Sequence, residues 1–129
     1  MTDGDIRVVL ADDHTVVRTG LKAVLGAARD IHVIGEAQNG REAVAMTAAE
    51  HPDVVVLDLS MPDLNGLQAA TLIHNQFPET QLILLTMHDS LELKDQLTAS
   101  GIRACIRKDD LNQLVIAIRN ACQLEPKLS

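Results

Sequence analysis

Residues 54–66, which read VVVLDLSMPDLNG, decide how this chain folds. The apolar, β-branched run from Val54 to Leu57 has the length of one buried strand, and it ends on a single carboxylate, Asp58. The Pro, Asp, Asn and Gly residues that follow are typical of a turn. An acid at the carboxyl end of a parallel strand lies where α/β sheets bind their ligands. An Asp that only caps the turn would give the same pattern, so the rest of the chain has to distinguish the two interpretations.

The composition indicates one domain with an aliphatic core. The chain has 129 residues, 47% of them hydrophobic, and Phe77 is its single aromatic residue. No apolar run is long enough to span a membrane, and the acidic amino-terminal residues are unlike a signal peptide, so we expect a cytoplasmic protein. The net charge of −7 makes this stretch a poor nucleic-acid binder by itself, because phosphate attraction needs a basic surface. Cys105 and Cys122 lack metal-ligand spacing, and we expect two buried thiols.

Apolar runs and helical periodicities alternate along the chain. Short apolar runs predict strands over residues 6–11, 31–37, 53–57, 81–86 and 102–107. The segments between and after them predict helices over 15–26, 41–50, 67–76, about 91–99 and about 111–124. This alternation predicts an α/β, doubly wound parallel sheet of five strands, with five helices on its two faces and right-handed crossovers. We expect residues 1–123 to form this domain and residues 124–129 to begin a linker.

Polar residues stand at the ends of four predicted strands. Asp12 and Asp13 follow the first strand, Asp58 the third and Lys108 the fifth, while Thr86 ends the fourth. The carboxyl ends of parallel strands share one edge of a sheet, so these groups should converge. Three neighbouring carboxylates do not all stay ionised without a cation, and Mg²⁺ is a hard ion that binds such oxygen ligands. The sequence therefore predicts a magnesium site.

The same residues favour phosphoryl transfer. Lys108 supplies an ammonium and Thr86 a hydroxyl, and both suit phosphoryl oxygens. A carboxylate that lies beside a metal ion, an ammonium and a hydroxyl can attack phosphorus as a nucleophile. The predicted product is an aspartyl phosphate at Asp58.

Four separated motifs resemble one family. The segments VLADDH (9–14), VLDLSMPDLNG (56–66), LLTMHD (84–89) and IRKDD (106–110) together resemble the receiver domain of bacterial two-component response regulators. More narrowly, they are similar to the NarL/FixJ type, in which the receiver precedes a helix-turn-helix DNA-binding domain. The resemblance covers about residues 6–122. It implies a flavodoxin-like fold with strand order 2-1-3-4-5.

The resemblance assigns roles to the acidic residues. It implies that Asp58 is the phosphoacceptor and that Asp12 and Asp13 hold Mg²⁺ together with Asp58. The backbone carbonyl of Ser60 would complete the protein ligands of the metal.

The resemblance also implies how a phosphoryl group is sensed. Thr86 would sense the group and Lys108 would bind it. Receivers commonly carry Tyr or Phe two or three residues before this lysine, where this chain has Cys105. We therefore expect readout through residues 87–92 and the fourth helix, with graded activation. Of the neighbouring residues, Met87 could narrow the entrance and His88 could take part in hydrolysis.

The partners expected from the resemblance are a sensor histidine kinase and a second copy of the chain in a homodimer formed on activation. DNA would be bound only through a C-terminal domain absent from this chain. Two interpretations of the chain stay open: it is a part of a longer regulator, or it is a natural single-domain receiver. In either case catalysis would be limited to self-phosphorylation and autodephosphorylation.

Three other functions compete with a phosphorylation-switched receiver. A degenerate receiver would bind partners without phosphorylation, and Cys105 keeps this alternative open. A phosphohydrolase of the haloacid-dehalogenase kind would need a second acid two residues after the nucleophile, where this chain has Ser60. A flavodoxin would need hydroxyls and free amides after the first strand, whereas Asp12 and Asp13 would repel the phosphate of FMN.

Overall fold

Strands and helices alternate along the described residues, 4–87 and 94–123 of the computed structural model. Their order is β1 (Ile6–Ala11), α1 (Thr15–Gly26), β2 (Ile31–Ala37), α2 (Gly40–Glu50), β3 (Val54–Asp58), α3 (Gly66–Gln76), β4 (Gln81–Thr86), α4 (Lys94–Ala99), β5 (Ile102–Arg107) and α5 (Asn112–Gln123). The predicted alternation is confirmed: β1, α1, β2, β4 and β5 have the expected bounds, and α2, β3, α3 and α5 differ by one residue at one or both ends. The expected start of the fourth helix, near residue 91, and the linker from residue 124 lie outside the described residues.

The strands form one parallel sheet in the order β2-β1-β3-β4-β5, as expected. In the central pairs, Val55 lies beside Val9 of β1 and Leu82 of β4. Asp58, the last residue of β3, pairs with Leu85. The carboxyl ends of β1, β3 and β4 therefore lie next to one another along one edge of the sheet.

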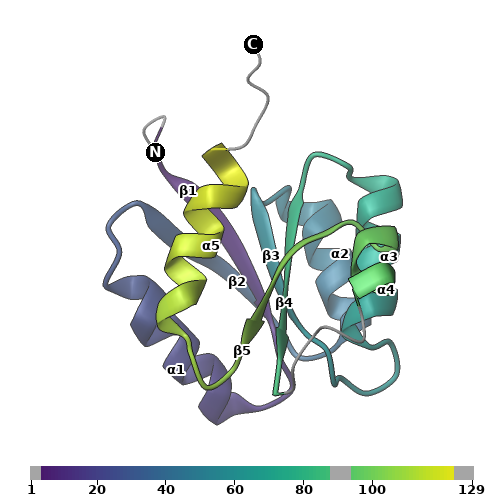
Figure 1. The fold of residues 1–129 in the computed structure, drawn as a ribbon, viewed down its shortest axis with the longest axis horizontal. Helices are drawn as coiled ribbons and strands as arrows, with labels where there is room; N and C mark the ends of the chain where they lie inside the picture. Colours follow the sequence, from purple (N-terminus) through teal and green to yellow (C-terminus); the bar gives the residue numbers. More distant parts are fainter. Residues whose placement is uncertain (1–3, 88–93, 124–129) are drawn as a thin grey trace.

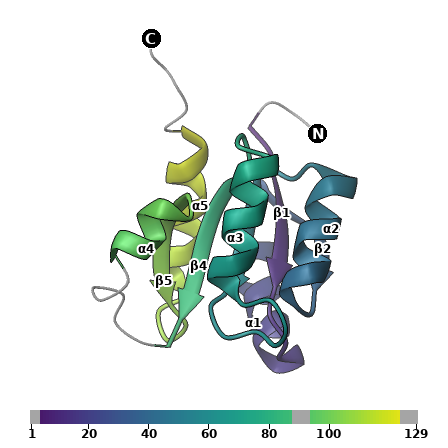
Figure 2. The ribbon, with the colours of Figure 1, turned by 90° about the vertical axis from the view of Figure 1, so that its right-hand side faces the viewer.

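Helices cover both faces of the sheet (Figures 1 and 2). Helices α1 and α5 lie on one face, and α2, α3 and α4 lie on the other. Successive strand side chains alternate between the faces, so strands that are buried on both sides need apolar residues throughout. The α1/α5 core includes Val8, Leu10, Val54, Val56, Leu21 and Leu114. The core on the α2/α3/α4 face includes Val9, Ala11, Val55, Leu57, Ile73 and Leu97.

The cysteines depart from the expectation of two buried thiols. Both are only partly buried. Cys105 packs against the core on the α2/α3/α4 face, and Cys122 packs against the α1/α5 core. The two thiols therefore lie on opposite faces of the sheet, and Cys105 is only partly buried because β5 is an edge strand.

None of the helices in residues 4–87 and 94–123 combines the length and the apolar character needed to cross a bilayer.

Candidate functional site

The turn after β1 places two acids at the edge of the sheet. The backbone N–H of Asp12 continues the β1–β2 pairing by donating to the carbonyl of Ala37 at 3.1 Å. The Asp12 side chain is fully buried, whereas that of Asp13 is 28% exposed. Asp12 Oδ1 accepts the backbone N–H of His14 at 2.8 Å, which closes the turn before α1. One carboxylate of this pair therefore lies inside the fold and the other lies at its surface.

Asp58 ends β3, and its side chain is almost completely buried. Its Oδ1 accepts the backbone N–H of Ser60 at 3.2 Å. The loop then returns close to Asp58, because the backbone N–H of Gly66 donates to the carbonyl of Leu59 at 3.1 Å. A Cβ atom on Gly66 would overlap the carbonyl oxygen of Asp58, so this approach needs glycine. The start of α3 thereby fixes the backbone around Asp58.

Lys108 joins the two buried carboxylates. Its Nζ lies 3.2 Å from Asp12 Oδ2 and 3.0 Å from Asp58 Oδ2. Its own backbone N–H donates to the carbonyl of Thr86 at 2.8 Å, which ties the turn after β5 to the end of β4. Both carboxylate oxygens meet the ammonium as ion pairs and have no hydrogen-bond partner with good alignment. One ammonium therefore faces two buried negative charges.

Thr86 is buried at the end of β4, one residue beyond the partner of Asp58. Side chains alternate along a strand, so Thr86 shares the face of Leu84, which belongs to the core under α3 and α4. Leu84 pairs with Cys105, and Thr86 pairs with Arg107. Cys105 is thus a diagonal neighbour of Thr86 on the same face. The structure brings Asp12, Asp58 and Lys108 into contact, and it places Thr86 at the adjoining strand end.

The electrostatics of the site follow from this burial. Burial raises the pKa of Asp58, and the nearby charge of Asp12 adds to the increase, while Lys108 partly opposes it. Burial of Lys108 disfavours its charge, but the contacts with Asp58 and Asp12 outweigh burial and raise the pKa of Lys108. Lys108 is therefore held as an ammonium, and the ionised form of Asp58 is disfavoured.

The donor set fits a divalent cation. Asp12, Asp13, His14 and Asp58 each offer one ligand atom, and these atoms lie within 4.8 Å of one another. Asp12 Oδ2 and Asp58 Oδ2 are buried without hydrogen-bond partners, as expected of oxygens that a cation would satisfy. Ser60, the other expected contributor, lies in the turn after Asp58 and is exposed.

Sequence reasoning missed two residues at this site. The Nδ1 atom of His14 lies 3.0 Å from Asp13 Oδ1. The position of His14 directly after two aspartates in the sequence was a signal that could have identified it. Arg18, on α1, is buried and donates through Nη1 to the backbone carbonyl of Asp12 at 2.6 Å. Its Nε also meets Glu36 Oε1 at 3.2 Å. Hydrogen bonding to Lys22, with a smaller contribution from Arg18, lowers the pKa of Glu36.

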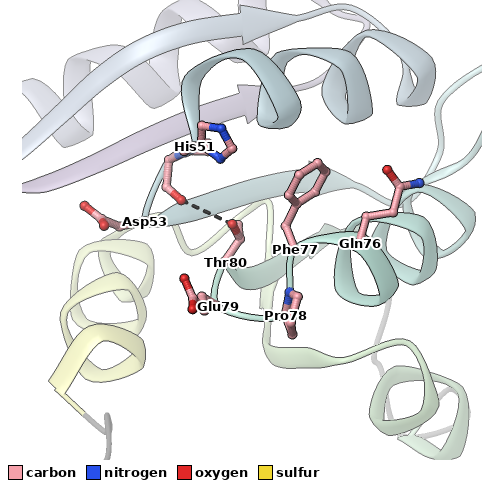
Figure 3. Close-up of a pocket in the computed structure, with 8 residues that line it drawn as sticks. His51, Asp53, Gln76, Phe77, Pro78, Glu79 and Thr80 are labelled. Atoms are coloured by element: carbon pink, nitrogen blue, oxygen red, sulfur yellow. Dashed lines mark hydrogen bonds between the residues drawn. The ribbon is translucent and has the colours of Figure 1, made fainter.

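A separate cavity lies at the opposite edge of the sheet, at the amino-terminal ends of β3 and β4 (Figure 3). Its volume is about 380 Å³. Thr80 donates to the carbonyl of Pro52 at 3.3 Å, and Asp53 accepts the backbone N–H of Arg7 at 2.9 Å. The ring of Phe77 stands edge-on to that of His51. These groups join neighbouring loops, and the cavity shares no residue with the acidic site.

Comparisons with known proteins agree on one family. The model of the response regulator receiver domain matches residues 8–119. The oxygen regulatory protein NreC of Staphylococcus epidermidis is 40% identical over 122 residues, which are 93% of this chain and 56% of that protein. The transcriptional regulatory protein YhcZ of Bacillus subtilis is 38% identical over 124 residues, which are 96% of this chain and 58% of that protein. The chain thus spans little more than half the length of these curated relatives.

Solved structures with similar folds include two receiver domains. The signal receiver domain of the response regulator NarL from Mycobacterium tuberculosis has a TM-score of 0.81 at 29% identity, covering 90% of this chain and 97% of that one. The response regulator domain of CheB from Thermotoga maritima has a TM-score of 0.87 at 28% identity, covering 95% of this chain and 99% of that one.

Proposed function

This chain belongs to the response regulator receiver domain family, with relatives of the NreC and NarL type, and from that membership we propose that it is a switch controlled by phosphorylation of Asp58. The observation that carries the proposal is the buried Asp58 carboxylate, held 3.0 Å from Lys108 beside a second buried acid. A buried nucleophile with one cationic neighbour and further oxygen ligands is suited to accept a phosphoryl group.

The transfer step uses groups of this chain in defined roles. A carboxylate oxygen of Asp58 attacks the phosphorus atom of phosphohistidine on a sensor kinase, which forms an O–P bond. The N–P bond of the donor breaks, and its electron pair stays on the imidazole nitrogen. Lys108 would bind one phosphoryl oxygen by charge, and Thr86 would donate its hydroxyl hydrogen to another. Hydrolysis of the aspartyl phosphate would reset the switch, and catalysis would be limited to this self-phosphorylation and autodephosphorylation.

The expected metal ligands are Asp12, Asp13, Asp58 and the backbone carbonyl of Ser60. Bound Mg²⁺ would neutralise charge on the phosphoryl oxygens during transfer. Asp12 and Asp13 would hold the ion, and Arg18 would keep the Asp12 backbone in place through its carbonyl. Three clustered carboxylates, two of which share one ammonium, favour a cation even without a phosphoryl group.

The output would be transcriptional. The relatives NreC and YhcZ are regulatory proteins nearly twice as long as the matched segment. We propose that this receiver controls a C-terminal helix-turn-helix domain and that activation changes contacts in a homodimer. DNA would be bound by that second domain, since the receiver itself carries a net charge of −7. The cytoplasmic location of the protein stays a prediction.

Intact mass spectrometry tests the proposal. The protein is incubated with acetyl phosphate and Mg²⁺, and one added phosphoryl group is expected on the wild type. Asp58→Asn and a sample with excess chelator should show no adduct. If a cognate kinase also fails to label the wild type, the chain acts instead as a phosphorylation-independent binding module.

A further inference from the structure

The acidic site carries a nitrogen ligand beside its oxygens. His14 Nδ1 lies 3.0 Å from Asp13 Oδ1 and 3.3 Å from Asp12 Oδ1. Together with Asp58 these residues offer four ligand atoms within 4.8 Å of one another. Ligand atoms around an octahedral ion with bonds of about 2.1 Å lie roughly 3 to 4 Å apart. A small contraction would therefore bring all four atoms onto one ion.

The backbone holds His14 in place, and its exposed ring lies beside the two acids, with Nδ1 within hydrogen-bond distance of Asp12 Oδ1. The N–H of His14 donates to Asp12 Oδ1 at 2.8 Å, so the residue is fixed beside the buried acid. His14 is the N-cap of α1, in an extended conformation, but its side chain makes no capping hydrogen bond. The ring is 61% exposed, so it can turn toward an ion without breaking core packing.

The buried acids give an independent reason to expect an ion here. Asp12 Oδ2 and Asp58 Oδ2 are buried without a hydrogen-bond partner and face only the ammonium of Lys108 among the described residues. The carboxylate of Asp13 lies in the same cluster, where it pairs with His14. The site thus has an excess of negative charge and two oxygens that a dication would satisfy.

The metal preference follows from the ligand types. Mg²⁺ prefers oxygen ligands and keeps several waters, so an imidazole adds little to its affinity. Imidazole suits Co²⁺, Ni²⁺ and Zn²⁺, whose affinities for mixed nitrogen and oxygen sites exceed those of the earlier divalent metals. Resting on the metal site of the proposed function, which takes Mg²⁺, we infer that His14 becomes an additional ligand when a divalent transition metal occupies the site, so that it raises the affinity for such a metal without raising the affinity for Mg²⁺.

Metal titrations of the whole chain test this inference. Co²⁺ binding is followed by visible absorption, and Mg²⁺ binding is followed by amide chemical shifts. His14→Gln should weaken Co²⁺ binding by about tenfold or more and change Mg²⁺ binding by less than about twofold. In the wild type, Zn²⁺ should also shift the ring nitrogen resonance of His14. Equal effects of His14→Gln on both metals, or no effect on Co²⁺, would overturn the inference.

Three controls separate the outcomes. His14→Ala repeats the test with a second side chain, and circular dichroism checks that each variant folds. His51→Asn removes an exposed imidazole at the opposite edge of the sheet and should change neither affinity; Asn suits the left-handed conformation at this position, where φ is 48°. Asp13→Asn should weaken the binding of both Co²⁺ and Mg²⁺. A wild type that binds no Mg²⁺ would contradict the proposed function itself, whereas a failure confined to His14→Gln would leave that function intact.

Discussion

At the scale of single residues, Asp58 is held in an environment that disfavours its own charge. Burial is the main cause of its raised pKa, and the charge of Asp12 adds to it. A carboxyl group whose pKa is raised by folding stabilises the fold while it is protonated. That contribution is fully present below the pKa of the unfolded chain and is lost as the pH rises through the folded-state pKa. Ionised Asp58 therefore destabilises the domain at neutral pH.

Asp58→Asn should consequently stabilise the domain at pH 7. Asn keeps the shape of the side chain and removes the buried charge, while Lys108 retains its ion pair with Asp12 at 3.2 Å. We expect the melting temperature to rise by several degrees, which is what about 1 kcal/mol produces in a domain of this size. The difference should be smaller at pH 4, because the raised pKa of Asp58 favours its protonation as the pH falls. Thermal unfolding in chelator at both pH values measures it, and a lower melting temperature at pH 7 would contradict the assignment.

Lys108→Met should have the opposite effect. It leaves Asp12 and Asp58 buried without their shared cation, and breaking such a pair costs roughly 3–5 kcal/mol. The matched control is Lys22→Met, which removes an ion pair between the partly exposed Lys22 and Glu36 and should cost less than about 1 kcal/mol. Urea unfolding gives both free energies. If the two variants lose similar stability, Lys108 does not neutralise the buried acids.

At the scale of elements, the junction of β3 and α3 depends on Gly66. A side chain there would meet the backbone of Asp58 and Leu59, which cannot move without shifting the site. We expect Gly66→Ala to lose about 1–3 kcal/mol of stability and to weaken Mg²⁺ binding. In the control, Gly20→Ala, the new methyl group enters open space on helix α1 and should stabilise by about 0.5–1 kcal/mol. Urea unfolding and magnesium titration compare the two, and a Gly66→Ala protein as stable as the wild type would contradict the close approach.

The elements themselves could be predicted from the sequence, because strands buried on both faces are continuous apolar runs and turn residues bound them. The strand ends then brought Asp12, Asp58 and Lys108 together in the prediction, since parallel strands share one edge. The contacts of Arg18 could not be predicted in this way. Its partner Glu36 lies 18 residues away on β2, and the pairing depends on how α1 packs over that strand. The ring position of His14 likewise depends on the turn conformation.

The switch is expected to involve β4, β5 and α4. Cys105 lies diagonal to Thr86 on the face that Leu97 of α4 covers, and it is too small to act as a rotating ring. A charge-assisted hydrogen bond contributes about 1.5–3 kcal/mol, which shifts a balanced equilibrium without inverting it. Beryllofluoride with Mg²⁺ should therefore shift the amide signals of Met87, Leu97 and Cys105 to positions between those of the inactive and the active state, because the two states exchange and their chemical shifts are averaged. Unchanged signals at these residues would contradict this route of readout. The predicted role of His88 concerns a residue outside the described ranges.

At the scale of the whole molecule, the two cores support a site that lies at one sheet edge. The α1/α5 core and the core under α2, α3 and α4 each pack against one face of the sheet. Strand ends from β1, β3, β4 and β5 all contribute to this edge. Binding of a cation there therefore couples to the cooperative folding of the domain, because the unfolded chain does not bring these groups together.

Magnesium should accordingly raise the stability of the entire domain. At ten times its Kd, a ligand that binds only the folded state stabilises by about 1.4 kcal/mol. We expect urea midpoints monitored by far-ultraviolet circular dichroism to rise with Mg²⁺ in the wild type and to stay constant in Asp13→Asn, whose partly exposed carboxylate can be replaced at little cost to folding. Raising NaCl to equal ionic strength controls for screening of the net charge of −7. Equal gains with NaCl and Mg²⁺, or equal gains in the variant, would show general screening instead of a site, since only specific binding requires Asp13.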